Sequence, residues 1–154
     1  GTDFRIKQKM DAVDVFPKEY GYVVIVLVLY IFLNFWMGAQ VGKARKRFNV
    51  PYPALYVSES ENKDAKAFNC VQRGHQNSLE WLPIYFLLML LGGFHHPLIC
   101  AGFGLLYNVT RYFYFTGYST GVPENRAKIG KYTYLALLGL LICTISFAVG
   151  LLLK

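Results

Sequence analysis

The sequence predicts an all-α fold, an integral membrane bundle of four helices, from three observations. Of the 154 residues, 55% are hydrophobic, whereas soluble domains usually contain about 45–50% apolar residues. The apolar residues gather in four long stretches, and about 20 residues are enough for a helix to cross a bilayer. An aromatic content of 17% excludes a disordered chain. We expect a single membrane domain at residues 10–154, after an expression-tag remnant at residues 1–9.

The first helix is expected at residues 20–41, a stretch that is too long for the core of a signal peptide. Its main polar side chain is Asn34, which suits a hydrogen bond between helices. A polar connection is expected over residues 42–67, because Pro51 and Pro53 interrupt a helix.

Three further helices are expected at residues 68–94, 97–118 and 132–153. The helix at 68–94 has a polar first half and an apolar second half, and Pro83 can bend it. Paired glycines and paired histidines before Pro97 predict a tight turn. Residues 119–131 are expected to form the last loop.

Lysine and arginine are unevenly distributed among the connections. The connections after the first and third helices hold six and three of them, and the turn after the second helix holds none. The positive-inside rule therefore predicts that both basic loops face the cytosol and that both termini face the other side. We interpret the net charge of +7 as this membrane signal and expect no nucleic-acid partner.

Charged side chains inside membrane helices are costly unless they are paired or near water, so they are candidates for function. Three polar residues of the second helix have spacings of four and three and share one face: Arg73, Asn77 and Glu80. Four residues of the third helix share a face in the same way: Tyr107, Arg111, Tyr114 and Tyr118. Both faces lie near the basic loops.

With Arg45 and Arg126, these residues suit a small zwitterionic ligand with more than one carboxylate. Arginine binds carboxylates through two parallel hydrogen bonds, and Glu80 can accept an ammonium group. A plainer alternative is that Arg73 and Glu80 only hold the bundle together, and that the tyrosines form an interfacial belt. The three cysteines are scattered, with no CxxC pattern, and we expect no metal.

The segment from Phe68 to Glu80 has the pattern Phe-x4-Arg-x3-Asn-x2-Glu. It resembles the signature of the membrane-associated proteins in eicosanoid and glutathione metabolism, the MAPEG family. The full form of this segment is most similar to the type 3 microsomal glutathione S-transferase branch. Further matching motifs are Ala44-Arg45-Lys46, Tyr52-Pro53, His96-Pro97 and the run from Arg111 to Pro123.

The resemblance implies a homotrimer in endoplasmic-reticulum membranes, with glutathione bound between subunits near the cytosolic side. It implies eight glutathione contacts: Arg45, Arg73, His75, Asn77, Glu80, Arg111, Tyr114 and Tyr118. It implies that Arg126 is catalytic and stabilises the glutathione thiolate. Three features differ from the leukotriene C synthase branch, namely Trp81, Lys46 and the spacing from Tyr118 to Arg126.

The implied activity is that of a glutathione transferase acting on lipophilic electrophiles or lipid hydroperoxides that arrive from the membrane lipids. Glutathione peroxidase and leukotriene C synthase activities are included in this prediction. Two alternatives stay open, a non-catalytic member that holds or presents a lipid, and a small channel or transporter. The presence of Arg126 favours the enzyme, and the clustering of ionisable residues at one interface disfavours the channel.

Overall fold

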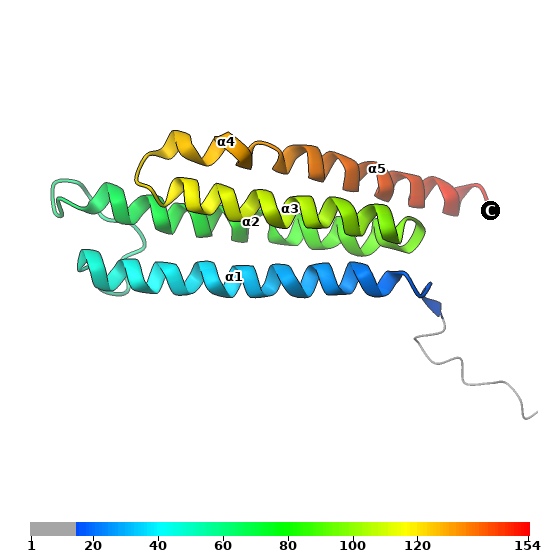
Figure 1. Cartoon of the computed structure of the whole chain (residues 1–154), viewed down its shortest axis with the longest axis horizontal. Helices are drawn as coiled ribbons and strands as arrows, with labels where there is room; N and C mark the ends of the chain where they lie inside the picture. The colour runs from blue at the N-terminus through cyan, green and yellow to red at the C-terminus, as the bar shows by residue number, and fades with distance from the viewer. Residues whose placement is uncertain (1–14) are drawn as a thin grey trace, which may run out of the picture.

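The computed structural model describes residues 15–154, which form long helices that run along a common axis (Figure 1). In chain order the elements are α1 (Tyr20–Phe48), α2 (Ala65–His95), α3 (Pro97–Tyr118), the 3-10 helix η2 (Pro123–Arg126), the short α4 (Ala127–Gly130) and α5 (Thr133–Leu152). No strand is present within these described residues. The tag remnant predicted at residues 1–9 lies outside them.

The first helix is longer than predicted. Residues 42–48 continue α1 instead of beginning the connection, because alanine, lysine and arginine are good helix formers and basic residues stabilise a helix C-terminus. The helix ends at Phe48, and the next residue, Asn49, has a left-handed φ of 54°, which is typical of a helix cap. Pro51 follows and prevents further helix.

The predicted loop at 119–131 also contains helical structure. Pro123 begins η2, which fits the preference of proline for the first helical position, and α4 follows directly. The other helices lie close to their predicted positions, and α3 has the predicted bounds. Pro83 lies inside α2, which continues on both sides of it.

Three helices, α1, α2 and α5, are long and apolar enough to cross a membrane. Helix α3 is not among these three. Its 22 residues are long enough to cross a bilayer, but its polar side chains lower its mean hydropathy. Three of these, Asn108, Thr110 and Arg111, are buried inside the bundle. The outer surface instead exposes many large apolar side chains, as a bilayer requires. The chain is therefore an integral membrane helical bundle.

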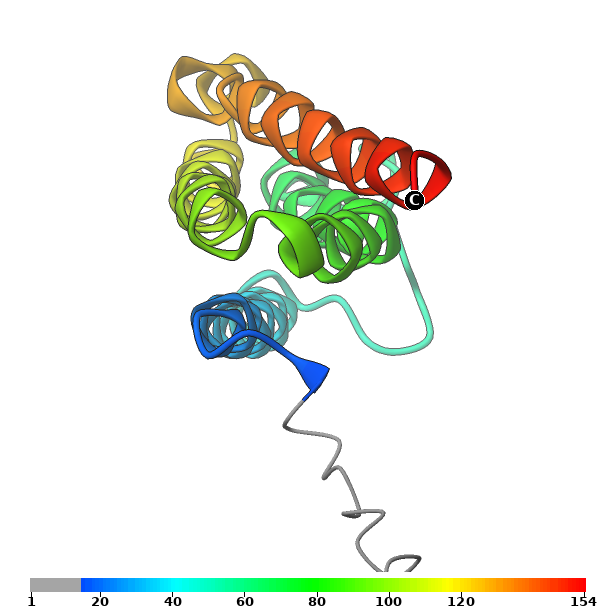
Figure 2. The ribbon, with the colours of Figure 1, turned by 90° about the vertical axis from the view of Figure 1, so that its right-hand side faces the viewer.

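Helices α2 and α3 form the middle of the bundle. They pack against each other, and each packs against α1 and α5, which the end-on view places on opposite sides of α2 and α3 (Figure 2). The connection from α1 to α2 and the connection from α3 to α4 lie at the same end of the bundle (Figure 1). We call this the basic end, because the last turn of α1 carries Arg45, Lys46 and Arg47, and the short helices after α3 carry Arg126 and Lys128.

The long connection at the basic end is held to the helices by asparagine side chains. Asn69 Nδ2 donates to the Val57 carbonyl at 2.8 Å, and the Val57 amide donates to Asn69 Oδ1 at 3.0 Å. Asn62 Nδ2 donates to the Phe48 carbonyl at 2.9 Å. The bond to Phe48 satisfies a carbonyl that the end of α1 leaves open, and the bonds to Val57 order the loop beside α2.

Candidate functional site

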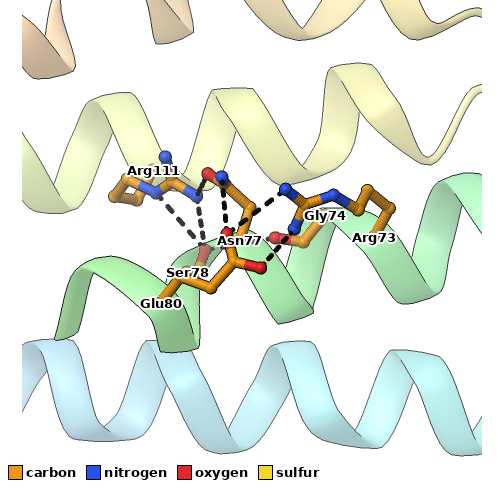
Figure 3. A network of polar contacts seen from close by, with 6 residues as sticks. All are labelled: Arg73, Gly74, Asn77, Ser78, Glu80 and Arg111. Carbon is orange, nitrogen blue, oxygen red and sulfur yellow. Dashed lines mark hydrogen bonds and ion pairs between the residues drawn. The ribbon is translucent and has the colours of Figure 1, made fainter.

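Two charged residues on the surface of α2 pair with each other (Figure 3). Arg73 Nη1 lies 2.9 Å from Glu80 Oε1, and Arg73 Nη2 lies 3.2 Å from Glu80 Oε2. The two side chains are 37% and 50% exposed, so the pair lies on an open face of the bundle. This pairing is what the plainer, structural interpretation of Arg73 and Glu80 predicts, and it also leaves both groups accessible to a ligand.

The pair extends through an amide to a buried arginine of α3. Asn77 Nδ2 donates to Glu80 Oε2 at 3.4 Å. Asn77 Oδ1 accepts from Arg111 Nη2 at 2.9 Å. A continuous polar network thus links Arg73 at the surface to Arg111, which is 2% exposed (Figure 3).

Ser78 completes the anchoring of Arg111. Its hydroxyl accepts from Arg111 Nη2 at 2.7 Å and from Arg111 Nε at 3.3 Å. It donates to the Gly74 carbonyl at 3.2 Å. The sequence did not predict that Ser78 belongs to this network, although Ser78 directly follows Asn77 and lies one helical turn after Gly74. A serine inside a helix gives no signal of its own until the facing helix is placed.

The tyrosines of α3 connect Arg111 to Arg126. Arg111 Cζ lies 4.1 Å from the ring centroid of Tyr114, and the Tyr114 and Tyr118 rings are 5.8 Å apart. Arg126 Cζ lies 5.2 Å from the centroid of Tyr118. The two tyrosine rings therefore form a row between the two guanidinium groups. Each guanidinium is attracted to its neighbouring ring, because a cation within about 6 Å of an aromatic face interacts favourably with it.

The backbone holds Arg126 near this row. Arg126 Nη1 donates to the Pro123 carbonyl at 2.6 Å, which keeps the side chain over its own turn. Gly117 of α3 lets the turn approach, because a Cβ there would lie 2.5 Å from the Asn125 carbonyl oxygen. A Cβ at Gly130 would likewise lie 2.9 Å from Tyr114. Both glycines are therefore needed for close packing.

A small cleft opens at the basic end beside this row. Its volume is about 270 Å³, and its walls include Tyr56, Lys66, Arg73, Tyr118 and Pro123. Ligand pockets commonly have volumes of about 300–1,000 Å³. The cleft is therefore slightly too small to enclose a tripeptide-sized ligand.

Two predicted contacts, His75 and Arg45, lie away from the network. His75 Nε2 lies 3.1 Å from Asn34 Oδ1 of α1, so the ring faces α1 rather than α3. Arg45 is 8% exposed, and its Nη1 donates to the Ala54 carbonyl at 2.8 Å. Its Cζ lies 4.4 Å from the ring centroid of Tyr52. The chain therefore does not bring these two residues together with the other seven predicted site residues.

The fold and the site define a class of protein. It is a small helical membrane protein with an arginine-, asparagine- and tyrosine-rich site at the basic end of its bundle. Within residues 15–154, no group of three or more histidine, cysteine, aspartate or glutamate side chains is placed to hold a metal ion.

A family model described as the MAPEG family matches residues 23–146. The chain belongs to this family, as predicted.

Curated relatives agree with this assignment. The chain is 32% identical to human microsomal glutathione S-transferase 2 over 117 residues, which cover 73% of this chain and 75% of that protein. It is 32% identical to the bovine protein of the same name over 109 residues, with coverage of 68% and 70%. The mouse protein is 29% identical over 107 residues, with coverage of 66% and 68%. These relatives carry the type 2 name, so the type 3 branch stays a prediction.

Proposed function

We propose that this protein is a membrane glutathione transferase, which activates glutathione as a thiolate and directs it at lipophilic electrophiles. The name of the curated relatives supports the activity class. The observation that carries the proposal for this chain is the polar network from Arg73 and Glu80 to Arg111, continued by two tyrosines to Arg126.

The surface pair suits the two kinds of charge on glutathione. The tripeptide carries two carboxylates and one ammonium group, and Arg73 can bind a carboxylate through two parallel hydrogen bonds. The Glu80 carboxylate can accept hydrogen bonds from the ammonium group. On binding, each side chain exchanges its present partner for a group of the ligand. Because the pair is exposed, breaking it costs little.

Arg126 is the residue that we assign to thiol activation. A free thiol has a pKa of about 8.5, so little thiolate exists at neutral pH. A nearby guanidinium favours the charged form and lowers the thiol pKa. Arg126 is partly exposed and lies over Tyr118 at 5.2 Å, where a ligand bound along the tyrosines would come close to it.

The chemistry then follows from the thiolate. Its lone pair forms a carbon–sulfur bond with the electrophile, and the leaving group departs or an opened ring oxygen takes a proton. With a lipid hydroperoxide, the thiolate attacks the O–O bond and the released alkoxide is protonated to an alcohol. A second glutathione converts the resulting sulfenic acid to the disulfide and water. We propose peroxidase activity as a second reaction of this site, and leukotriene C synthesis as one form of the first.

The site is proposed to lie between subunits of a homotrimer. The cleft of a single chain is small, the His75 ring faces Asn34 of α1, and Arg45 belongs to α1 itself and binds the Ala54 carbonyl. One subunit can therefore offer the network residues while its neighbour offers His75 and Arg45. We further propose that the basic end faces the cytosol, following the positive-inside rule, and that the membrane is that of the endoplasmic reticulum.

The alternative is a member of the family that holds a lipid without reacting. The complete network and Arg126 favour the enzyme over that alternative.

The buried charged side chains of the described residues, Arg45 and Arg111, both belong to the basic half of the bundle. This distribution gives no support to a channel.

The proposal is tested with purified protein reconstituted in lipid vesicles. We expect saturable consumption of glutathione with an aryl halide electrophile and with a fatty-acid hydroperoxide. A folded, glutathione-binding protein that turns over neither substrate would contradict the transferase and support the lipid-holding alternative.

A further inference from the structure

A second groove at the basic end lies between α1 and α3 and is not part of the site described above. Its volume is about 470 Å³, and its lining includes Trp36, Lys43, Arg47, Phe115, Ser119 and Thr120. None of its lining residues contributes to the cleft beside Arg73 and Tyr118. The transferase mechanism uses neither this groove nor its two basic residues.

The groove is basic at one end and apolar at the other. Lys43 and Arg47 are spaced by four residues and so share one face of α1, and both are exposed. The lining includes no acidic residue, and the one ion pair in residues 15–154 joins Arg73 to Glu80. The positive charge of Lys43 and Arg47 is therefore available to an anionic group.

The apolar end lies deeper along the same helix. Trp36 is 37% exposed, and its ring contacts the Phe115 ring edge-on at 5.5 Å. Phe115 itself is buried and forms the floor with Val71 and Ala44. At 1.5 Å per residue, Trp36 lies about 17 Å from Arg47 along α1. This length suits a headgroup at one end and an acyl chain at the other.

We propose that this groove binds an anionic phospholipid. Its phosphate would lie near Lys43 and Arg47, and one acyl chain would lie against Trp36 and Phe115. Juxtamembrane basic residues attract anionic lipids, and an amphipathic indole suits the interfacial depth. Charge complementarity favours an anionic lipid over a zwitterionic one.

Trp36 provides the probe for a direct test. The chain has two tryptophans, so the variant Trp81→Phe leaves Trp36 as the single emitter. This variant is reconstituted in phosphatidylcholine vesicles that contain a minor fraction of acyl-brominated lipid, either phosphatidylserine or phosphatidylcholine. We expect stronger quenching by the brominated phosphatidylserine.

The basic residues are then removed in the same background. The variant Lys43→Gln/Arg47→Gln should lower the preference for phosphatidylserine by up to about fivefold for each lost charge. The matched control is Lys46→Gln/Lys63→Gln, which removes the same charge at the same end but outside this groove. Circular dichroism and gel filtration verify that each variant is folded.

Three outcomes would overturn the proposal. Equal quenching by the two brominated lipids would mean that the groove has no charge preference. An equal loss of preference in the control would indicate attraction to the whole basic end. Absence of quenching by either lipid would mean that another copy of the chain covers the groove. The assay uses no glutathione, so its result does not depend on the proposed transferase activity.

Discussion

Arg111 and Arg126 contact the same row of tyrosines, but their surroundings differ at the scale of single atoms. Arg111 is buried, and its donors already engage Ser78 and Asn77. Arg126 is partly exposed and makes one hydrogen bond to a backbone carbonyl within the described chain. Arg126 can therefore turn toward an incoming thiol, whereas Arg111 is suited to hold the network in place.

Replacing Arg126 should impair the reaction more than the binding of glutathione. For Arg126→Gln we expect turnover at neutral pH to fall about tenfold or more, because loss of a nearby cation raises the thiol pKa by at least about one unit. The pH–rate profile should shift toward the free-thiol pKa of about 8.5. The control is Lys128→Gln, an exposed charge on the same connection. Unchanged turnover and pH profile in Arg126→Gln would exclude the assigned role.

Replacing either residue of the surface pair, Arg73 or Glu80, should weaken the binding of glutathione. Arg73→Gln and Glu80→Gln are each expected to raise the KM for glutathione about tenfold or more, since each removes a charged hydrogen bond to the ligand. The thermal midpoint should change little, because exposed ion pairs contribute about 0–1 kcal/mol. A large loss of stability with an unchanged KM would instead support the structural interpretation of the pair.

Replacing Ser78 should lower the stability of the folded protein. The variant Ser78→Ala leaves two buried donors of Arg111 without their acceptor, and such a loss costs about 1–3 kcal/mol. We expect a lower midpoint in a detergent thermal-unfolding assay, while Ser60→Ala, on the exposed loop, should leave it unchanged. Equal midpoints for the two variants would show that Ser78 does not anchor Arg111.

At the scale of elements, the connection between α3 and α5 positions Arg126. It is a pair of short helical turns, η2 and α4, which pack on α3 through the glycine at 117. A side chain at that position would force the turn away from the tyrosine row.

The variant Gly117→Ala tests this packing. We expect turnover to fall between about tenfold and a hundredfold, because a displacement of about 1 Å is enough to cause such a loss. The matched control is Gly102→Ala in the same helix, where a Cβ meets nothing within 4 Å. Equal activity of the two alanine variants would show that the close approach at Gly117 is not needed.

The elements also show what could be predicted from the sequence. The apolar stretches predicted the four long helices, and residue spacing predicted that Arg73, Asn77 and Glu80 share a face, because both depend on local helical geometry. The end of α1 was missed because the apolar pattern ends before the helix-forming basic residues do. Contacts such as Arg111 with Ser78, and His75 with Asn34, depend on how neighbouring helices are rotated, which a single sequence does not specify.

At the scale of the whole molecule, the proposed site needs more than one subunit. The network and Arg126 lie on one side of α2, and His75 faces α1. We call the network with Arg126 the first set of site residues, and His75 with Arg45 the second set. In a closed ring, each site would then combine the first set of one subunit with the second set of its neighbour.

Mixed oligomers test this arrangement. We expect His75→Ala subunits and Arg126→Ala subunits to be impaired alone and to recover activity when they are co-assembled. In a trimeric ring that contains both variants, about one site in three would take both intact sets from different subunits. Glutathione conjugation by the doubly affinity-purified mixture is the measurement. Absence of recovery in stable mixed oligomers would mean that each site lies within one subunit.

The central claim is that this bundle binds glutathione and ionises its thiol. An ultraviolet difference spectrum on adding glutathione to the purified protein tests this claim most directly. We predict a thiolate band that saturates with glutathione and is lost in Arg126→Gln. A folded oligomer that gives no thiolate band, or an equal band in Arg126→Gln, would contradict the claim.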